Sequence, residues 1–252
     1  MIILASRLSR PQPLSLSSVS LFLDLDGTLA PIELRPEAVG PRPERSALLR
    51  RLGDGLSGRM AIVSGRSLAS IDAILDSAVP AAAGVHGLER RRPNGDILRP
   101  APHPGLIEAK AALERFAAAR PGVLVEDKQL AVTVHYRLAQ HAGPDALALA
   151  GRLADELGLR LQTGDMVAEL KTPGADKGDA LRAFMAEAPF SNGRPVFVGD
   201  DVTDEDGFRA AHDLGGFGVL VGPPRETVAS FGLNDVADVL DWLGQASESV
   251  RR

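Results

Sequence analysis

The chain of 252 residues contains no cysteine, which excludes disulfide bonds, thiolate metal sites and a cysteine nucleophile. It also lacks an apolar run of the roughly 18 residues that a membrane-spanning helix needs. The first 20 residues lack the long apolar core and cleavage site of a signal peptide. Neither sign of charge dominates, because 28 basic residues stand against 33 acidic ones. We therefore expect a cytoplasmic protein that binds neither nucleic acid nor a membrane.

Aromatic residues make up only 4% of the chain and no heptad pattern is evident, so the sequence favours a monomer. No Gly-x-Gly-x-x-Gly motif follows the first predicted strand, which disfavours a dinucleotide-dependent redox enzyme. Apolar residues, in contrast, make up 44% of the chain. Over this length they suffice for one large domain or for a domain with an insert.

Predicted strands and helices alternate at both ends of the chain. Apolar runs bounded by turn residues indicate strands, and apolar residues at helical spacing indicate helices. This alternation is typical of an α/β fold, in which right-handed crossovers build a parallel sheet. The predicted strands are 18–24, 60–63, 81–85, 195–198 and 218–221, and the predicted helices are 44–52, 68–75, 177–187, 205–212 and 236–243.

The pattern changes between a proline-rich segment, 100–105, and the sequence Lys-Thr-Pro-Gly at 171–174. Two predicted helices and several short strands between these segments indicate a separate α+β module. The helices are 106–119 and 146–157, and the strands are 123–126, 130–136, 160–163 and 167–170. The expected organisation is an N-terminal arm at 1–17, a core made of 18–103 and 172–252, and an inserted domain at 104–171.

Two carboxylates, Asp24 and Asp26, end the first predicted strand in the sequence Leu-Phe-Leu-Asp-Leu-Asp-Gly-Thr-Leu. A buried carboxylate is costly unless a cation pairs with it. Two acids one residue apart at a strand end can share a divalent ion, one through its side chain and the other through its backbone carbonyl. A carboxylate placed there can also attack an electrophile such as phosphorus. By itself, an Asp-x-Asp pair would equally suit a surface loop.

Three further clusters follow predicted strands or begin helices. Ser64, in Ile-Val-Ser-Gly-Arg, can donate to a phosphate oxygen or can cap a helix. Lys177 falls in the first turn of a helix, where the dipole disfavours a cation unless an anion or a group of acids faces it. Asp200 and Asp201 end another apolar strand, and their oxygen ligands favour Mg²⁺ over zinc.

Ligands of open parallel sheets bind at the carboxyl ends of the strands, where all four clusters are predicted. Together the clusters resemble the haloacid dehalogenase superfamily of phosphotransferases. More narrowly, the chain resembles the trehalose-6-phosphate phosphatase family. The residues that carry these resemblances are Asp24-x-Asp26-Gly27-Thr28-Leu29, Ser64-Gly65-Arg66, His135-Tyr136-Arg137, Glu169, Lys177 and Gly199-Asp200-Asp201-Val202-Thr203-Asp204-Glu205.

The resemblance implies a Rossmann-like three-layer core with a parallel sheet and an inserted α+β cap of the C2 type. It implies a Mg²⁺-dependent phosphoric monoester hydrolase that converts trehalose 6-phosphate to trehalose and phosphate through an aspartyl-phosphate. Asp24 would be the nucleophile and Asp26 the general acid and base. Ser64, Gly65 and Lys177 would hold the phosphate, with Ser64 and Lys177 counted as catalytic.

The resemblance also implies a metal site and a sugar site. Mg²⁺ would lie between the carboxylates and the phosphate, because two anions must approach each other there. The implied metal ligands are Asp24, Asp26, Asp200, Asp201 and Asp204. The candidate sugar contacts, mostly on the mobile cap, are Arg66, Gly87, Glu126, Lys128, His135, Arg137 and Glu169, with Glu89 as a loosely matching acid near the third strand.

Other interpretations stay open at this point. Polar residues on the strands of the insert would also suit a solvated face or a structural ion pair. The same core motifs would suit a phosphatase of sucrose phosphate, mannosylglycerate phosphate or a hexose phosphate. A non-catalytic regulatory domain that binds Mg²⁺ and phosphate is a further alternative. Such a domain could lack Asp24 or Asp26, whereas this chain has both.

Overall fold

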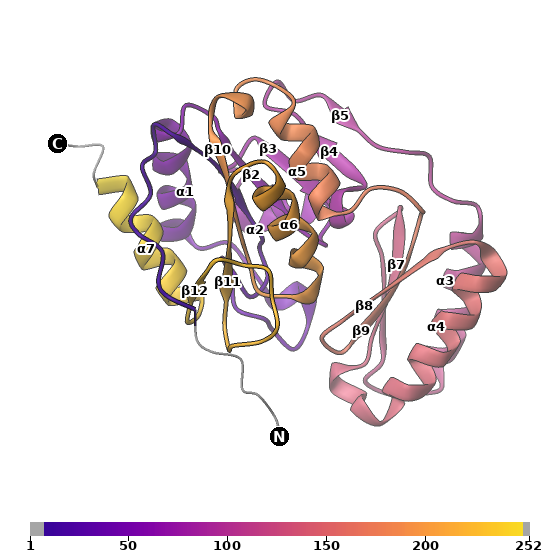
Figure 1. The fold of residues 1–252 in the computed structure, drawn as a ribbon. Helices are drawn as coiled ribbons and strands as arrows, with labels where there is room; N and C mark the ends of the chain where they lie inside the picture. The colour runs from indigo at the N-terminus through magenta and orange to yellow at the C-terminus, as the bar shows by residue number, and fades with distance from the viewer. Residues whose placement is uncertain (1–7, 249–252) are drawn as a thin grey trace. The chain divides into compact units, whose positions relative to one another are not determined.

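The computed structural model describes residues 8–248. The chain divides into two compact units (Figure 1). The first unit is made of two segments, one that ends at Leu98 and one that begins at Ala175, and the second unit is Arg99–Gly174. The second unit encloses the predicted insert at 104–171. The first seven residues of the expected N-terminal arm lie outside the described residues.

An 8-stranded sheet forms the centre of the first unit. Its strands are β1 Val19–Leu23, β2 Met60–Val63, β3 Ala81–Gly84, β4 Glu89–Arg91, β5 Ile97–Leu98, β10 Arg194–Gly199, β11 Phe217–Val221 and β12 Phe231–Leu233. Their order is β12-β11-β10-β1-β2-β3-β4-β5. The strands from β11 to β3 pair in parallel, as predicted. The parallel strand β12 and the antiparallel strands β4 and β5 were not predicted.

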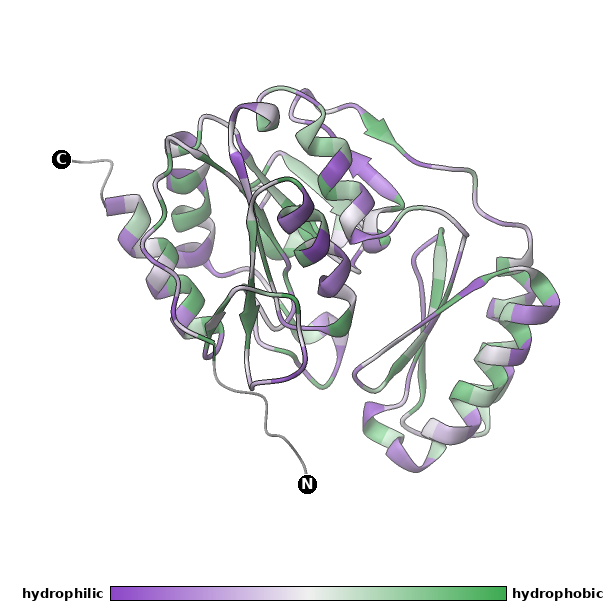
Figure 2. Cartoon of the chain, in the orientation of Figure 1, coloured by the Kyte–Doolittle hydropathy of each residue, from purple (hydrophilic) through white to green (hydrophobic). Residues whose placement is uncertain are grey.

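Helices cover both faces of this sheet. They are α1 Pro43–Gly55, α2 Leu68–Leu75, α5 Lys177–Met185, α6 Glu205–Asp213 and α7 Val236–Glu248. Successive strand residues point to opposite faces. In β1, Leu21 and Leu23 pack with α1, α2 and α7, while Phe22 packs with α5 and α6. Figure 2 shows the resulting apolar interior, and the three layers confirm the predicted α/β class.

The described part of the N-terminal segment packs against this core without forming a helix or strand. Leu14 and Leu16 are buried in the cluster that contains α1 and α7. The indole Nε1 of Trp242 donates to the carbonyl of Gln12 at 3.0 Å. Apolar burial and this hydrogen bond therefore tie the segment to α7.

The second unit is an α+β module. Its strands are β6 Leu124–Asp127, β7 Ala131–His135, β8 Arg160–Gly164 and β9 Val167–Lys171, and its helices are α3 Gly105–Ala118 and α4 Gly143–Leu157. The strands form an antiparallel sheet in the order β6-β7-β9-β8. Val132, Val134, Ala168 and Leu170 pack with the two helices, so one face of this sheet is apolar.

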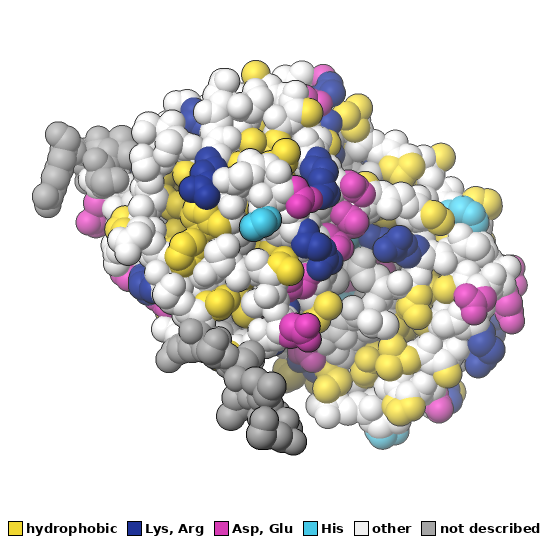
Figure 3. All heavy atoms as spheres, viewed as in Figure 1, with side chains coloured by type: hydrophobic (Ala, Val, Ile, Leu, Met, Phe, Trp, Pro, Cys, Tyr) yellow, Lys and Arg dark blue, Asp and Glu magenta, His cyan; other side chains and the backbone are white. Residues whose placement is uncertain are grey.

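Short 3-10 helices occupy several loops. They are η1 Pro36–Ala38, η2 Val85–Gly87, η3 Arg137–Ala142, η4 Phe190–Asn192 and η5 Val202–Asp204. Among the described residues, no helix has the length and apolar character needed to cross a membrane. On the face shown in Figure 3, basic and acidic side chains are mixed, and neither forms a large patch of a single charge.

Candidate active site

Three polar residues follow neighbouring parallel strands of the core sheet. Asp24 follows β1, Ser64 follows β2 and Asp200 follows β10, and β1 lies between the other two strands. Leu23 is in register with both Val198 and Ile62. The chain therefore leaves these three strands at the same edge of the sheet, which is where ligands of open α/β sheets bind.

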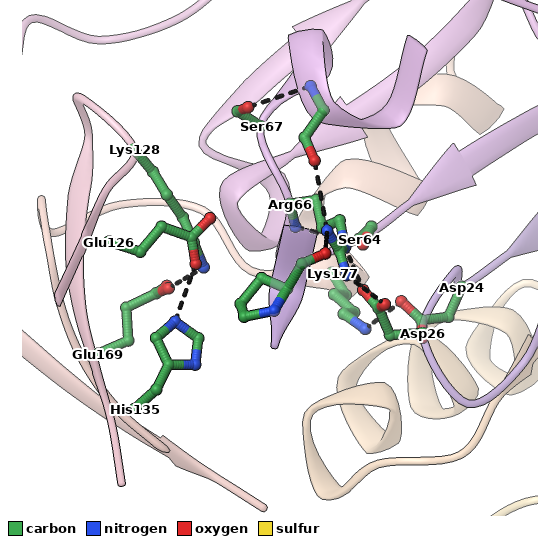
Figure 4. Close-up of polar contacts among 12 residues, drawn as sticks. Asp24, Asp26, Ser64, Arg66, Ser67, Glu126, Lys128, His135, Glu169 and Lys177 are labelled. Carbon is green, nitrogen blue, oxygen red and sulfur yellow. Dashed lines mark hydrogen bonds and ion pairs between the residues drawn. The ribbon is translucent and has the colours of Figure 1, made fainter. Parts of the chain in front are cut away.

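Lys177 lies against two of the acids. It is the first residue of α5, which begins after Asp176, whose side chain accepts the N–H of Asp179 at 2.9 Å. The Lys177 Nζ donates to Asp24 Oδ1 at 2.8 Å (Figure 4) and to Asp204 Oδ1 at 2.6 Å. Its side chain is only 3% exposed. The helix position that disfavours a cation is thus occupied by a buried ammonium that faces carboxylates.

Asp24, Asp200 and Asp204 form one cluster, in which one oxygen of each lies within 4.8 Å of the others. Burial raises the pKa of Asp24 well above its usual value, and Asp204 and Asp200 add to this against the opposing charge of Lys177. Burial, with a contribution from Asp204, raises the pKa of Asp200 to about 7. Burial alone would lower the pKa of Lys177, but Asp204 and Asp24 hold it above its usual value.

This cluster fits a hard divalent cation. Its donors are carboxylate oxygens, which Mg²⁺ and Ca²⁺ prefer. Three carboxylates face one ammonium, so full ionisation leaves an excess of negative charge that a cation would offset. Burial is the main cause of the raised pKa values of these acids, and the charges of neighbouring acids add to it.

Backbone contacts shape the loop that carries Asp200. Asp204 is fully buried, and its Oδ2 accepts the N–H groups of Asp200 and Asp201, both at 2.9 Å. Asp201 Oδ1 accepts the N–H of Val202 at 2.7 Å, so this side chain serves its own turn. Gly27 has a φ of +80°, and a Cβ there would lie 2.0 Å from Asp200 Oδ2. Only glycine therefore allows the two acidic loops to approach this closely.

Asp26 lies outside the three-acid cluster and pairs with Arg66. The guanidinium donates through Nε and NH2 to the two carboxylate oxygens at 2.7 and 2.8 Å (Figure 4). Arg66 also donates to the carbonyl of Pro36 at 2.9 Å. A bidentate pair of this kind fixes both the position and the orientation of the carboxylate.

The serine motif forms a compact turn after β2. Ser64 is 1% exposed, and its Oγ accepts the N–H of Arg66 at 3.2 Å. A Cβ on Gly65 would lie 2.5 Å from the His86 Nε2. A side chain at Gly65 would therefore require the His86 imidazole to move.

Gly87 and Glu89 have structural roles. A Cβ on Gly87, whose φ is +101°, would lie 2.3 Å from the carbonyl oxygen of Asp176. Gly87 therefore lets the chain pack against the residue that precedes Lys177. Glu89 Oε1 accepts the N–H of Leu68 at 2.7 Å, which caps the start of α2.

A polar row crosses the second unit on the face opposite its helices. The strand registers align Glu126, Thr133, Glu169 and Gln162 across all four strands. Glu169 Oε2 accepts the hydroxyl of Thr133 at 2.6 Å and the ammonium of Lys128 at 2.5 Å (Figure 4). Three of the predicted sugar contacts thus lie on one face of this sheet.

His135 and Arg137 are the other two residues of this unit that were predicted to contact the sugar, and their surroundings differ from each other. His135 Nε2 lies 2.9 Å from Glu126 Oε2, on the same polar face (Figure 4). Burial would raise the pKa of Glu126, but the His135 hydrogen bond and the charge of Lys128 lower it below its usual value. Arg137 donates to the backbone and the side chain of Asp165, both at 2.9 Å, so the structure does not bring it into this cluster.

Arg225 is a residue near the site that the sequence did not reveal. It donates to the carbonyl of Asp201 at 2.8 Å and pairs with Glu205. It lies in the loop between β11 and β12, in Gly-Pro-Pro-Arg, where no local pattern marks a functional residue.

Comparison with known proteins gives consistent matches. Residues 22–236 match the family model described as trehalose-phosphatase. A probable trehalose-phosphate phosphatase of Sinorhizobium fredii is 38% identical over 231 residues, which cover 89% of this chain and 86% of that protein. The trehalose-6-phosphate phosphatase of Escherichia coli is 38% identical, with 92% and 87% covered. The C-terminal domain of a Candida albicans trehalose-6-phosphate phosphatase has the same fold, with a TM-score of 0.82 at 22% identity, and the match covers 92% of this chain and 93% of that domain.

Proposed function

Because the chain belongs to the trehalose-phosphatase family, we propose that it hydrolyses trehalose 6-phosphate to trehalose and phosphate. One observation carries the proposal: the Asp24 carboxylate follows β1 and is bound by the buried ammonium of Lys177 within a group of three acids. A fixed, desolvated carboxylate beside a cation suits nucleophilic attack on a phosphate ester.

In the first step, an oxygen of Asp24 attacks phosphorus, and the bond from phosphorus to the sugar oxygen breaks. An aspartyl-phosphate forms, and Asp26 gives a proton to the departing sugar oxygen. The bidentate pair with Arg66 engages both carboxylate oxygens of Asp26. Donation of a proton therefore requires that one Asp26 oxygen exchange its contact with Arg66 for a proton.

In the second step, water attacks phosphorus and the aspartyl-phosphate bond breaks. Asp26 accepts the proton of the attacking water, phosphate leaves and the Asp24 carboxylate is restored. The contact with Arg66 orients the Asp26 carboxylate that accepts this proton. Ser64, the backbone of Gly65 and Lys177 would hold the phosphoryl oxygens, since Lys177 donates to Asp24 and Ser64 follows the strand next to β1.

Asp24, Asp200 and Asp204 would hold Mg²⁺, with the Asp26 carbonyl and Asp201 as further ligands. The oxygen-only donor set and the excess negative charge of the three acids support this assignment. When bound, the ion supplies the positive charge that lets a phosphate dianion approach a carboxylate.

The polar face of the second unit would bind the sugar. Glu126, Lys128 and Glu169 supply both hydrogen-bond donors and acceptors, which a disaccharide with many hydroxyl groups requires. Their mutual contacts keep these groups paired when no sugar is present, so sugar hydroxyls would exchange with those contacts. His135 supports Glu126 in this arrangement.

A phosphate-release assay over several sugar phosphates, with Mg²⁺ or with EDTA, tests the proposal. We expect strong preference for trehalose 6-phosphate and loss of activity in EDTA. Preference for sucrose phosphate, mannosylglycerate phosphate or a hexose phosphate would overturn the substrate. Activity that survives EDTA would overturn the metal, and release from none of these compounds would favour a regulatory domain.

A further inference from the structure

Arg225 links the loop between β11 and β12 to the loop that carries the acids. Its NH2 group donates to the backbone carbonyl of Asp201 at 2.8 Å and to that of Asp200 at 3.4 Å. Its NH1 group pairs with Glu205 and donates to the carbonyl of Glu226 at 3.1 Å. The guanidinium therefore spans from its own loop to two successive peptide groups of the acidic loop.

Glu205 completes this link from the other side. It is the first residue of α6 and directly follows the acidic loop, and its side chain is 10% exposed. One carboxylate oxygen accepts Arg225, and the other accepts the N–H of Val228 at 3.0 Å. Glu205 thus holds both the side chain of Arg225 and the backbone that follows it.

The backbone of Asp200 and Asp201 is consequently held on both sides of each Cα atom. Their N–H groups donate to Asp204 Oδ2, and their carbonyls accept Arg225. Rotation of either peptide would break a charge-assisted hydrogen bond, which is roughly twice as strong as a neutral one. The direction in which the Asp200 side chain leaves the backbone is thereby set by contacts of that backbone.

We propose that Arg225, paired with Glu205, is a positioning residue that holds the Asp200–Asp204 loop in the conformation that binds the metal ion. This inference rests on the proposed function. Arg225 acts on backbone carbonyls, and Glu205 compensates its charge, so its effect is on placement of the acids. Loss of residues that orient metal ligands weakens metal binding by roughly 10–100-fold.

The test compares Arg225→Gln, Arg225→Lys and Glu205→Gln with the wild type. Arg209→Gln is the control, because Arg209 is an exposed arginine of α6, the helix that follows this loop, and pairs with Asp206 within that helix at 2.7 Å. The rise in unfolding temperature with Mg²⁺ alone reports metal binding without turnover. Phosphate release from trehalose 6-phosphate across Mg²⁺ concentrations reports the same affinity during catalysis.

We expect the three test variants to need roughly 10–100-fold more Mg²⁺ in both measurements, and to approach the wild-type kcat at saturating Mg²⁺. Arg209→Gln should match the wild type. Unfolding curves in EDTA identify any variant that fails to fold, in which case the remaining two decide. Wild-type Mg²⁺ dependence in the folded test variants, or a loss of kcat alone, would overturn the inference. A wild type that neither binds Mg²⁺ nor hydrolyses trehalose 6-phosphate would instead overturn the proposed function.

Discussion

Replacing Lys177 with methionine removes a buried ammonium that contacts the acid cluster while keeping a side chain of similar size. Lys177 is 3% exposed and donates to Asp24 and Asp204 at 2.8 and 2.6 Å. Removing one partner from a buried ion pair costs about 3–5 kcal/mol. In a chain of this size each kcal/mol lowers the unfolding temperature by about 2–4 °C, so we expect a decrease of roughly 6–20 °C.

The size of this decrease should depend on pH. An acid whose pKa is raised in the folded state contributes stability that is lost as pH rises from the unfolded value through the folded one. For Asp200 this window runs from the ordinary pKa of an aspartate, 3.8, to about 7. Lys177 opposes the rise for Asp24 and Asp204, so its removal should make the loss of stability with pH steeper.

Thermal unfolding in EDTA at about pH 5 and about pH 8 measures both effects. Lys110→Met is the control, because Lys110 forms a 2.8 Å pair with Asp127 on the surface, at 41% exposure, and should change stability little. The reasoning is refuted if Lys177→Met stays within about 0.5 kcal/mol of the wild type at the higher pH, which is the range of a surface substitution.

Three further results are expected. Because the pKa of Asp200 is about 7 without metal, the Mg²⁺ affinity should weaken roughly tenfold for each pH unit below that value. The rise in unfolding temperature with Mg²⁺ measures this affinity, and an affinity independent of pH would contradict the assignment of Asp200 as a ligand. Asp26→Asn should slow release from trehalose 6-phosphate by about 10²–10⁴-fold, and by less with p-nitrophenyl phosphate, whose leaving group needs no proton; equal losses would remove Asp26 from its acid role. Glu169→Gln disrupts the contacts with Lys128 and Thr133. It should raise KM for trehalose 6-phosphate with little effect on the hydrolysis of p-nitrophenyl phosphate, and an unchanged KM would exclude the polar face as the sugar site.

The core of the site could be predicted because its residues stand next to strong local signals. Asp24, Ser64 and Asp200 each follow a short apolar strand, and parallel strands bring such positions to one edge. Lys177 stood out because a cation in the first turn of a helix needs an anion nearby. Its contacts with two carboxylates supply that anion.

Other features carry no local signal. The strand β4 reads Glu-Arg-Arg and pairs antiparallel with β3, so neither apolar alternation nor turn chemistry marks it. The pair between Arg66 and Asp26 joins residues that lie 40 positions apart in the chain. Arg225 reaches the acidic loop from a proline-rich segment. Long side chains find such partners only through the tertiary fold, which single-sequence patterns do not encode.

The central claim, that Asp24 is the nucleophile of a phosphatase, is tested most directly by phosphate release from trehalose 6-phosphate with saturating Mg²⁺ in Asp24→Asn and wild-type protein. The carboxamide cannot attack phosphorus, and its similar size should preserve the fold, which an unfolding curve checks. We predict release at the background rate from a folded variant. Release near the wild-type rate would contradict the account.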